Sequence, residues 1–352
     1  MAQAVKIGII GTGVGVAHIE AFSQLPDVTV TAVCSARETR AQEIADRFGI
    51  PLATADYRDV LRADVDAVVI ATPPALHLSM GLDTLAAGKH LLCEKPLTLT
   101  LAEAIILRDA ARKAGVIHMI NHHMRFNAPF ARIKELADDG YLGRLALADA
   151  RIAMNPVDYL RSPGWSDSKA GWFTDAAQLG GLMVGSAGPH LADFLLWYGG
   201  PIVEVATRVA VSRTEIPLAS GEVVHNVSSE DTFVTMVRFA GGGIGTVRGI
   251  PLANHGGGGF GLELYGTDGT LIVEGGALRG ATATEGAPTP LPVAADAPQD
   301  RVAIAARFVQ AIRAGGPSPA PSFDDGVAVQ ALLEACTAAA QGEGWVRVPV
   351  ID

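Results

Sequence analysis

The chain has 352 residues, more than one ordinary core holds, and its length predicts about two domains. Apolar residues make up 49% and charged residues 18%, which excludes an intrinsically disordered chain. The formal net charge is -10 and no basic stripe offsets it, so we expect no nucleic-acid partner. Cys34, Cys93 and Cys336 lie far apart without a CxxC pair, which favours a reduced protein over a disulfide framework or a zinc site.

The beginning of the chain leads straight into a predicted strand, so we expect no signal peptide. No apolar run approaches the roughly 18 residues that a membrane span needs. The histidines never reach metal-ligand spacing, which predicts no metal site. We therefore expect a soluble cytoplasmic protein without a membrane partner.

A glycine-rich turn follows the first predicted strand, Val5–Ile10, and precedes a predicted helix over residues 16–25. This order is typical of a dinucleotide-binding turn, whose helix N-terminus holds a pyrophosphate. A strict G-x-G-x-x-G would place its third glycine at Val16, so the turn departs from that pattern. The residues of the turn are Gly11, Thr12, Gly13, Val14 and Gly15.

The end of the second predicted strand, Val28–Val33, bears on the choice of cofactor. NAD-binding proteins place a carboxylate there, whereas an arginine accommodates the 2′-phosphate of NADP. Here a hydroxyl and two guanidinium groups follow, from Ser35, Arg37 and Arg40. The pattern favours NADP(H), with NAD(H) as the alternative if both arginines are only solvated residues that open a helix.

Strands and helices alternate through residues 1–125 and predict a doubly wound parallel sheet, the first domain. Ligands bind outside the carboxyl ends of such strands. The predicted strands are 28–33, 65–71, 91–93 and 116–120, and the helices are 39–48, 76–87 and 101–113. Thr72 and Pro73 follow one of these strands at the ligand edge.

Glu94, Lys95 and Pro96 follow the short apolar run that ends at Cys93. A partly buried ammonium is costly and its pKa shifts readily, and Pro96 keeps Lys95 out of the helical region. Lys95 is therefore a candidate catalytic group. The alternative is a surface lysine that pairs with Glu94.

Residues 126–352 have a different pattern and predict a second, α/β domain with a mainly antiparallel sheet, whose C-terminal helices could pack back on the first domain. We expect residues 256–259 to form a loop and residues 276–299 a surface excursion. The predicted strands are 145–153, 202–211, 232–239, 244–250, 261–265 and 270–273, and the predicted helices are 129–138, 182–197, 302–313 and 326–341.

Several other side chains are candidate ligand contacts. Trp165 and Trp172 could pack against a sugar ring or serve as plain hydrophobic anchors. His122, His123 and Arg125 follow a strand at the ligand edge and could reach substrate hydroxyls. We expect His77 to lie beside the cofactor and His18 to pack or cap locally.

Three stretches together resemble the glucose–fructose oxidoreductase / inositol dehydrogenase / rhizopine catabolism (Gfo/Idh/MocA) family over essentially the whole chain. They are Gly11-x-Gly13, Ala71-Thr72-Pro73-Pro74-x-x-His77 and Ala87-Gly88-Lys89-His90-x-x-Cys93-Glu94-Lys95-Pro96. Trp172, Gly180-Gly181, Gly188-x-His190-x-x-Asp193 and the run 265–269 resemble the second-domain motifs of this family.

The resemblance implies a Rossmann domain, then an α/β domain whose open antiparallel sheet commonly forms a homodimer or homotetramer interface. It implies NAD(P)-dependent oxidation or reduction of a carbinol carbon in a sugar, a polyol or a related compound. Lys95, before a usually cis peptide bond, would lie near nicotinamide and substrate hydroxyl, and His190 would exchange the proton. Ala71, Thr72, Pro73, His77 and Glu94–Pro96 would line the cofactor, and Ser186 would face the substrate.

Ser186 departs from the family pattern Asp-x-Gly-x-His, because a serine cannot act as a carboxylate partner for His190 or Lys95. This loss favours an alternative, a non-catalytic dinucleotide-binding sensor or scaffold. A third possibility is an enzyme that retains its cofactor for elimination or hydrolysis. The run Asn121–Arg125 resembles 1,5-anhydrofructose reductases, which use NADPH, and supports the NADP(H) prediction.

Overall fold

The computed structural model describes residues 4–161, 174–176, 181–218, 220–254, 258–294 and 297–351. The chain forms two compact units. The first contains Met1–Asn127 and Asp296–Gln330, and the second contains Ala128–Ala295 and Ala331–Asp352. No helix in the described ranges is long and apolar enough to cross a bilayer.

The first unit contains a six-stranded parallel sheet, which confirms the predicted doubly wound fold. Its strand order, β3-β2-β1-β4-β5-β6, reverses direction at β1 and β4, where dinucleotide ligands bind in such sheets. The strands are β1 (Val5–Ile10), β2 (Val28–Cys34), β3 (Leu52–Thr54), β4 (Ala67–Ile70), β5 (His90–Cys93) and β6 (His118–Ile120).

The helices of the first unit follow its strands, and their ends are set by local sequence. Thr100 and Glu103 form a capping box at the start of α5, and Gly115, at a φ of 66°, ends it. The helices are α1 (Gly15–Phe22), α2 (Glu38–Phe48), α3 (Tyr57–Arg62), α4 (His77–Ala86), α5 (Leu101–Ala114), α11 (Asp300–Ala314), the first part of α12 (Phe323–Gln341), and the 3-10 turns η1 (Pro74–Leu76) and η2 (His123–Phe126).

Residues near the end of the chain complete the core of the first unit. Ile304, Ala305, Phe308 and Val309 of α11 are buried in one cluster with residues of α1, β1 and β2. This apolar face explains why Asp296–Gln330 belongs to the first unit. The sequence assigned residues 126–352 to the second domain and allowed its C-terminal helices to pack back on the first.

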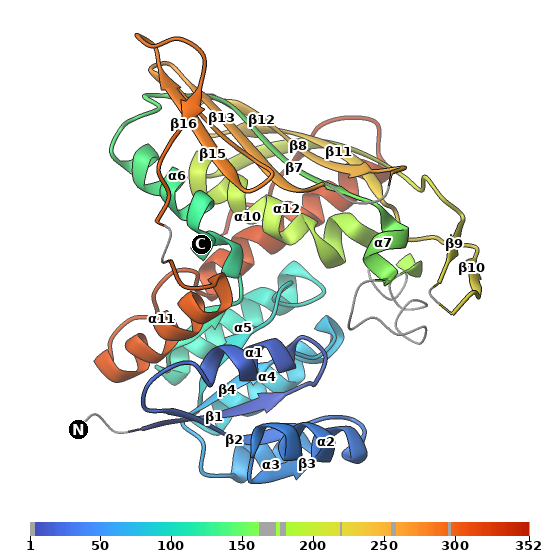
Figure 1. Ribbon diagram of the computed structural model, residues 1–352, viewed down its shortest axis with the longest axis vertical. Helices are drawn as coiled ribbons and strands as arrows, with labels where there is room; N and C mark the ends of the chain where they lie inside the picture. Colours follow the sequence, from blue (N-terminus) through green and yellow to red (C-terminus); the bar gives the residue numbers. More distant parts are fainter. Residues whose placement is uncertain are drawn as a thin grey trace. The chain divides into compact units, whose positions relative to one another are not determined.

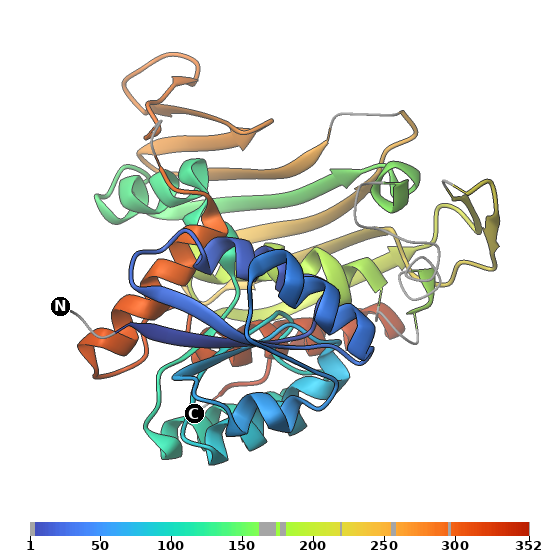
Figure 2. The same ribbon diagram turned by 60° about the horizontal axis from the view of Figure 1, so that its bottom comes forward.

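The second unit contains a nine-stranded sheet of order β16-β15-β14-β13-β7-β12-β11-β8-β17. Every pairing in it is antiparallel except β12 with β7, so the predicted, mainly antiparallel sheet is confirmed. Figure 2 shows the green β7 side by side with later, orange strands. The strands are β7 (Leu145–Met154), β8 (Ile202–Ala210), β11 (Thr232–Phe239), β12 (Ile244–Pro251), β13 (Gly259–Gly266), β14 (Gly269–Glu274), β15 (Ala277–Thr282), β16 (Thr289–Pro290) and β17 (Val346–Arg347).

Helices cover one face of this sheet. Along β11, Phe233, Val237 and Phe239 are buried, whereas Val234 and Met236 on the opposite face are exposed. The buried face packs against α10 (Gly188–Gly199) and the second part of α12, as Figure 1 shows. The other helices among the described residues of this unit are α6 (Ala128–Asp138), α7 (Pro156–Arg161) and the single π-helical turn η3 (Leu182–Ser186).

Four local predictions differ from the structure. Residues 276–299 contain β15 and β16, because Leu278 and Gly280 are buried and alternate with the exposed Ala277 and Arg279. The predicted helix 182–197 is divided into η3 and α10. Part of the predicted loop 256–259 lies outside the described residues, and Gly259 already opens β13. The short β3, α3 and the hairpin of β9 (Glu215–Pro217) with β10 (Val223–His225) had too few periodic residues to be predicted.

Candidate active site

The three glycines of the first turn have three different surroundings. Gly11 has a φ of 103°, and a Cβ there would lie 2.3 Å from the carbonyl oxygen of Ala71. A Cβ on Gly15 would lie 3.1 Å from Ile9, so the start of α1 packs closely on β1. A Cβ on Gly13 would meet no atom within 4 Å. Gly11 permits the tight turn, Gly15 the close helix–strand packing, and Gly13 leaves open space for the approach of a ligand.

The start of α1 carries no side-chain cap. Val14 is the N-cap residue, and its side chain makes no cap hydrogen bond. The N–H groups of Val16 and Ala17 donate to the carbonyl oxygens of Gly13 and Val14 at 3.5 Å and 2.9 Å, so an anion would be met by the N–H groups that precede them and by the positive end of the helix dipole. Thr12 Oγ1 donates to Ser35 Oγ at 3.0 Å and joins the turn to the end of β2. The arrangement fits the pyrophosphate of a dinucleotide, and Gly15 takes the place that the sequence pattern assigned to residue 16.

The two arginines after β2 differ in their surroundings. Arg40 Nη1 donates to Glu43 Oε2 at 3.1 Å. Arg37 is exposed and makes no ion pair with a carboxylate in the described part of the chain. Arg37 is therefore the better placed of the two for a 2′-phosphate.

His77 is a bridge between two backbone segments. Its Nε2 lies 2.9 Å from the carbonyl oxygen of Thr72, and its Nδ1 lies 3.0 Å from that of Pro96 and 3.2 Å from that of Leu97. The ring is fully buried, and burial lowers the pKa of His77 although the carbonyl contacts oppose this. His77 thus holds the loop after β4 to the segment after Lys95, a position from which it acts through the backbone.

Glu94 is a buried carboxylate at the carboxyl end of β5. Its Oε1 accepts hydrogen bonds from His18 Nε2 at 2.8 Å and from Asn121 Nδ2 at 2.7 Å. Arg301 Nη1 lies 3.7 Å from the same oxygen, and the backbone N–H of Lys95 donates to Oε2 at 3.2 Å. The carboxylate is held from α1, β6 and α11, which fixes the backbone that carries Lys95.

Electrostatics keep Glu94 ionised. Burial opposes ionisation, but the His18 hydrogen bond and the charges near the carboxylate, including Arg301 and Lys95, outweigh it, and the pKa of Glu94 lies well below its usual range. Burial also lowers the pKa of Lys95. The charge of Glu94 opposes this lowering, and the charge of Arg301 adds to it. Lys95 is thus an ammonium whose proton is held less tightly than usual, beside a permanent negative charge. The Lys95–Pro96 peptide bond is cis, as the resemblance implied.

The polar residues after β6 turn toward the C-terminal part of the first unit. Arg125 is buried and its Nη2 donates to Asp325 Oδ1 at 2.8 Å. His123 Nδ1 lies 2.8 Å from Asp300 Oδ2, and His122 is fully buried. These contacts tie β6 to α11 and α12, so the described partners of Arg125 and His123 are structural.

In the second unit, His190 lies in the first turn of α10. Its side chain is 7% exposed, and its ring meets that of Phe260 edge-on at 5.8 Å between centroids. Ser186, at the position where the resemblance implied an aspartate, ends η3 two residues before α10 begins. Trp165 and Trp172 lie outside the described residues.

Sequence reasoning missed several residues of this arrangement. Asn121 and His18 were singled out only as part of a motif and as a packing residue, and Arg301 was not considered. A further signal for Asn121 was its position directly after β6, parallel to Glu94 after β5. Within the described ranges, no group of three or more His, Cys, Asp or Glu side chains could hold a metal ion.

Comparison with known proteins gives consistent matches along the chain. Residues 5–122 match the GFO/IDH/MocA model, an oxidoreductase family with an NAD-binding Rossmann fold, and residues 130–272 match its C-terminal domain. An uncharacterized oxidoreductase of Synechocystis is 30% identical over 98% of this chain and 96% of its own length.

Relatives with an assigned activity are also similar. Levoglucosan dehydrogenase of Pseudarthrobacter phenanthrenivorans is 27% identical over 99% of this chain and 100% of that protein. The structure of a levoglucosan dehydrogenase with NADH has a TM-score of 0.88, with 27% identity, and covers 99% of this chain and 100% of that one. Myo-inositol 2-dehydrogenase of Thermotoga maritima is 26% identical over 76% of this chain and 75% of its own length.

Proposed function

Because the chain belongs to the GFO/IDH/MocA oxidoreductase family, we propose that it transfers a hydride between a nicotinamide dinucleotide and a carbinol or keto carbon. The substrate is a sugar, a polyol or a sugar derivative. The observation that carries the proposal is Lys95, an ammonium of lowered pKa fixed beside the buried, ionised Glu94 at the ligand edge of the sheet. A protein that only bound the dinucleotide would have no need of such a group.

The substrate class follows from the relatives. Levoglucosan dehydrogenase matches nearly the whole chain, and myo-inositol 2-dehydrogenase and a D-glucoside 3-dehydrogenase match about two thirds or more of it. Each of these names describes oxidation of a sugar or a cyclic polyol. A compound with several neighbouring hydroxyl groups is therefore the first class to test.

Two side chains of this protein would handle the substrate oxygen and its proton. The nicotinamide, when bound, supplies or accepts the hydride. Lys95 would donate a hydrogen bond to the reacting oxygen and stabilise the negative charge that develops there. His190 would exchange the hydroxyl proton, because an imidazole has a reference pKa near about 6.5 and can serve in either direction at neutral pH.

We further propose that NADP(H) is the preferred cofactor. Support comes from the absence of a carboxylate at residues 34–37 and from the exposed guanidinium of Arg37 just beyond β2. NAD(H) is the alternative, since the family model describes an NAD-binding fold and the levoglucosan dehydrogenase complex carries NADH. Arg40 would contribute less, because Glu43 already binds it.

We also propose that the protein forms a homodimer or homotetramer in the cytoplasm. The uncovered face of the large sheet exposes Val234, Met236 and Ile244, each between 46% and 53%. Apolar side chains gathered on an open sheet face are suited to association with a second copy. Light scattering of the purified protein measures the assembly directly.

The second candidate function is a non-catalytic dinucleotide sensor or scaffold. Ser186 favours it, because no carboxylate stands where the resemblance implied one. An enzyme that retains its cofactor for elimination or hydrolysis is a further variant of the main proposal. Release of reduced cofactor during turnover distinguishes the dehydrogenase from both.

The test is cofactor binding by tryptophan fluorescence, NADPH against NADH, on the wild type, Arg37→Ala and Arg40→Ala, followed by polyol oxidation. We expect Arg37→Ala to lower the preference for NADPH about tenfold or more, and Arg40→Ala to change it little. Equal binding of both cofactors, unchanged in Arg37→Ala, would assign NAD(H). Binding without turnover of any sugar or polyol would favour the sensor.

A further inference from the structure

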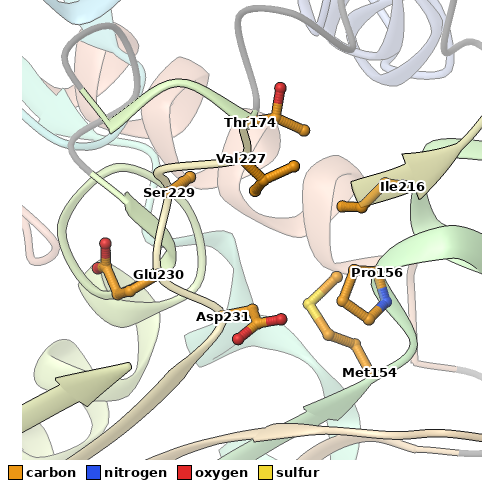
Figure 3. A pocket seen from close by; sticks show the side chains of 8 residues that line it. All are labelled: Met154, Pro156, Thr174, Ile216, Val227, Ser229, Glu230 and Asp231. Carbon is orange, nitrogen blue, oxygen red and sulfur yellow. The ribbon is translucent and has the colours of Figure 1, made fainter. Parts of the chain in front are cut away.

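A second buried carboxylate, Glu230, lies in the other unit and has no part in the function proposed above. It precedes β11, and its Oε1 accepts a hydrogen bond from the backbone N–H of Met183 at 3.1 Å. Burial raises the pKa of Glu230, and the Met183 hydrogen bond opposes this. The neighbouring Asp231 has another partner, since its Oδ1 accepts from the backbone N–H of Ser212 at 2.8 Å. Figure 3 shows the Glu230 and Asp231 side chains leaving the chain in opposite directions.

The approach of Glu230 to Met183 requires a glycine at residue 181. A Cβ on Gly181 would lie 1.6 Å from Glu230 Oε2, and the φ of Gly181 is +80°. Any larger residue would push the carboxylate away from the Met183 amide. The second glycine of the pair Gly180-Gly181 is thus explained by the carboxylate that packs on it.

The other side of the Met183 peptide is also closely packed. A Cβ on Gly188 would lie 1.5 Å from the carbonyl oxygen of Met183. Gly188 is the first residue of α10, and His190 is in the same turn. Met183 belongs to the π-helical turn η3, a feature frequent at functional sites. The backbone at Met183 therefore has Glu230 on its N–H and Gly188 against its C=O.

We propose that Glu230 is a positioning residue for His190: by binding the Met183 amide it fixes η3, and through the Met183–Gly188 contact it sets the start of α10. The inference rests on the function proposed above, in which His190 exchanges the substrate proton. It also gives an account of Ser186. The turn that has Ser186 in place of the family's aspartate is held by a carboxylate from the segment before β11.

The geometry does not favour a substrate role for Glu230. The cavity that Glu230 helps to line, with Met154, Ile216 and Val227, measures about 20 Å³. That volume accommodates about one water molecule and excludes a sugar ring. Glu230 accordingly acts through the backbone that it binds.

The experiment compares Glu230→Ala, Glu230→Gln, Gly181→Ala and the double variant Gly181→Ala/Glu230→Ala. We expect Glu230→Ala to lower kcat on the order of 10–100-fold, because the proton-exchanging group is displaced, while KM and cofactor affinity stay within about threefold. Glu230→Gln should retain most of kcat, since an amide oxygen can still accept from Met183. Gly181→Ala should resemble Glu230→Ala, and the double variant should lose no more than either single one, because each opens the same contact.

Asp231→Ala is the matched control, because it removes a carboxylate that caps a backbone amide on the same segment but binds Ser212 instead. We expect kcat to stay near the wild-type value. A Glu230→Gln variant as impaired as Glu230→Ala would overturn the positioning role in favour of a proton-transfer role. Additive effects of the Gly181 and Glu230 substitutions on kcat would show that the two residues do not act through one shared contact.

A readout without turnover separates this inference from the proposed function. In ¹³C-histidine-labelled protein, with His190 assigned through His190→Gln, the His190 resonance should move in Glu230→Ala and Gly181→Ala and stay in place in Asp231→Ala. An unmoved His190 resonance would overturn the inference even in an active enzyme. Absence of sugar oxidation with the expected resonance shifts would overturn only the proposed function.

Discussion

Two buried carboxylates, Glu94 in the first unit and Glu230 in the second, are held in contrasting ways. Glu94 is surrounded by side chains, with His18, Asn121 and Arg301 directed at one oxygen. Glu230 binds a backbone amide, and its approach depends on the absence of a side chain at Gly181. Charge compensates the first carboxylate, whereas local backbone shape accommodates the second.

The difference bears on the chemistry that each carboxylate can support. The compensated charge at Glu94 keeps the carboxylate ionised, and its field acts directly on the ammonium of Lys95. Glu230 has a raised pKa and so a weaker hold on its charge. Substitutions near Glu94 should therefore change the steps that depend on the charge of Lys95. Substitutions near Glu230 should change the backbone geometry of η3 and of the start of α10.

Loss of Lys95 should have the largest effect. Lys95→Met keeps the length and apolar stem of the side chain but removes the charge beside Glu94. We expect kcat to fall on the order of 10²–10³-fold, the usual loss when one donor to a developing oxyanion is removed, with cofactor binding retained. Steady-state kinetics and cofactor titration measure both.

The control for Lys95→Met is Lys113→Met, which removes an exposed ammonium from the last turn of α5. Its kcat should match that of the wild type. If Lys95→Met turned over substrate within about threefold of the wild type, Lys95 would be only an ion-pair partner of Glu94 and not a catalytic group.

The glycine turn offers a second, smaller contrast. Gly13→Ala should leave the free energy of unfolding nearly unchanged, since its Cβ meets no atom within 4 Å, but weaken dinucleotide binding at least about tenfold. Gly11→Ala should destabilise the fold by about 2–4 kcal/mol, because its Cβ would lie 2.3 Å from the Ala71 carbonyl oxygen at a φ of +103°. Urea unfolding and cofactor titration separate the two effects. Unchanged cofactor affinity in Gly13→Ala would show that the ligand does not approach this turn.

Local patterns were sufficient to predict much of the first unit. The strand, glycine turn and helix at residues 5–25 are adjacent in sequence, and buried parallel strands are nearly continuous apolar runs. The Glu94-Lys95-Pro96 run lies at a strand end, where parallel topology alone places ligand-facing groups. The sequence therefore indicated the sheet and the motifs that its ends carry.

Contacts between distant segments could not be predicted in the same way. Arg301 reaches Glu94, and Asp325 reaches Arg125, from helices near the end of the chain, and nothing in either helix specifies its partner. Gly181 and Glu230 come together only because β11 returns toward η3. The π-helical turn has no periodic signature, so the sequence predicted one continuous helix where the structure has two elements.

Replacement of Glu94 by Gln should have the smallest kinetic effect and should test charge compensation directly. The charge of Glu94 opposes the lowering of the Lys95 pKa by burial, so the uncharged amide in Glu94→Gln should lower that pKa further. The alkaline limb of the kcat/KM profile should then move to lower pH, while kcat at its optimum falls within about tenfold. Glu103→Gln, which alters an exposed cap of α5, should leave the profile unchanged.

The stability of the same variant has a pH dependence of definite sign. The pKa of Glu94 is lower in the folded protein than in the unfolded chain, so its contribution to stability is full above the unfolded pKa of about 4.3. That contribution declines as the pH falls from there toward the folded pKa. Wild type should therefore be more stable than Glu94→Gln at pH 7, and the gap should narrow below about pH 4 in urea unfolding. A gap that stayed constant with pH would mean that the hydrogen bonds of Glu94 to His18 and Asn121, and not its charge, supply its contribution to stability.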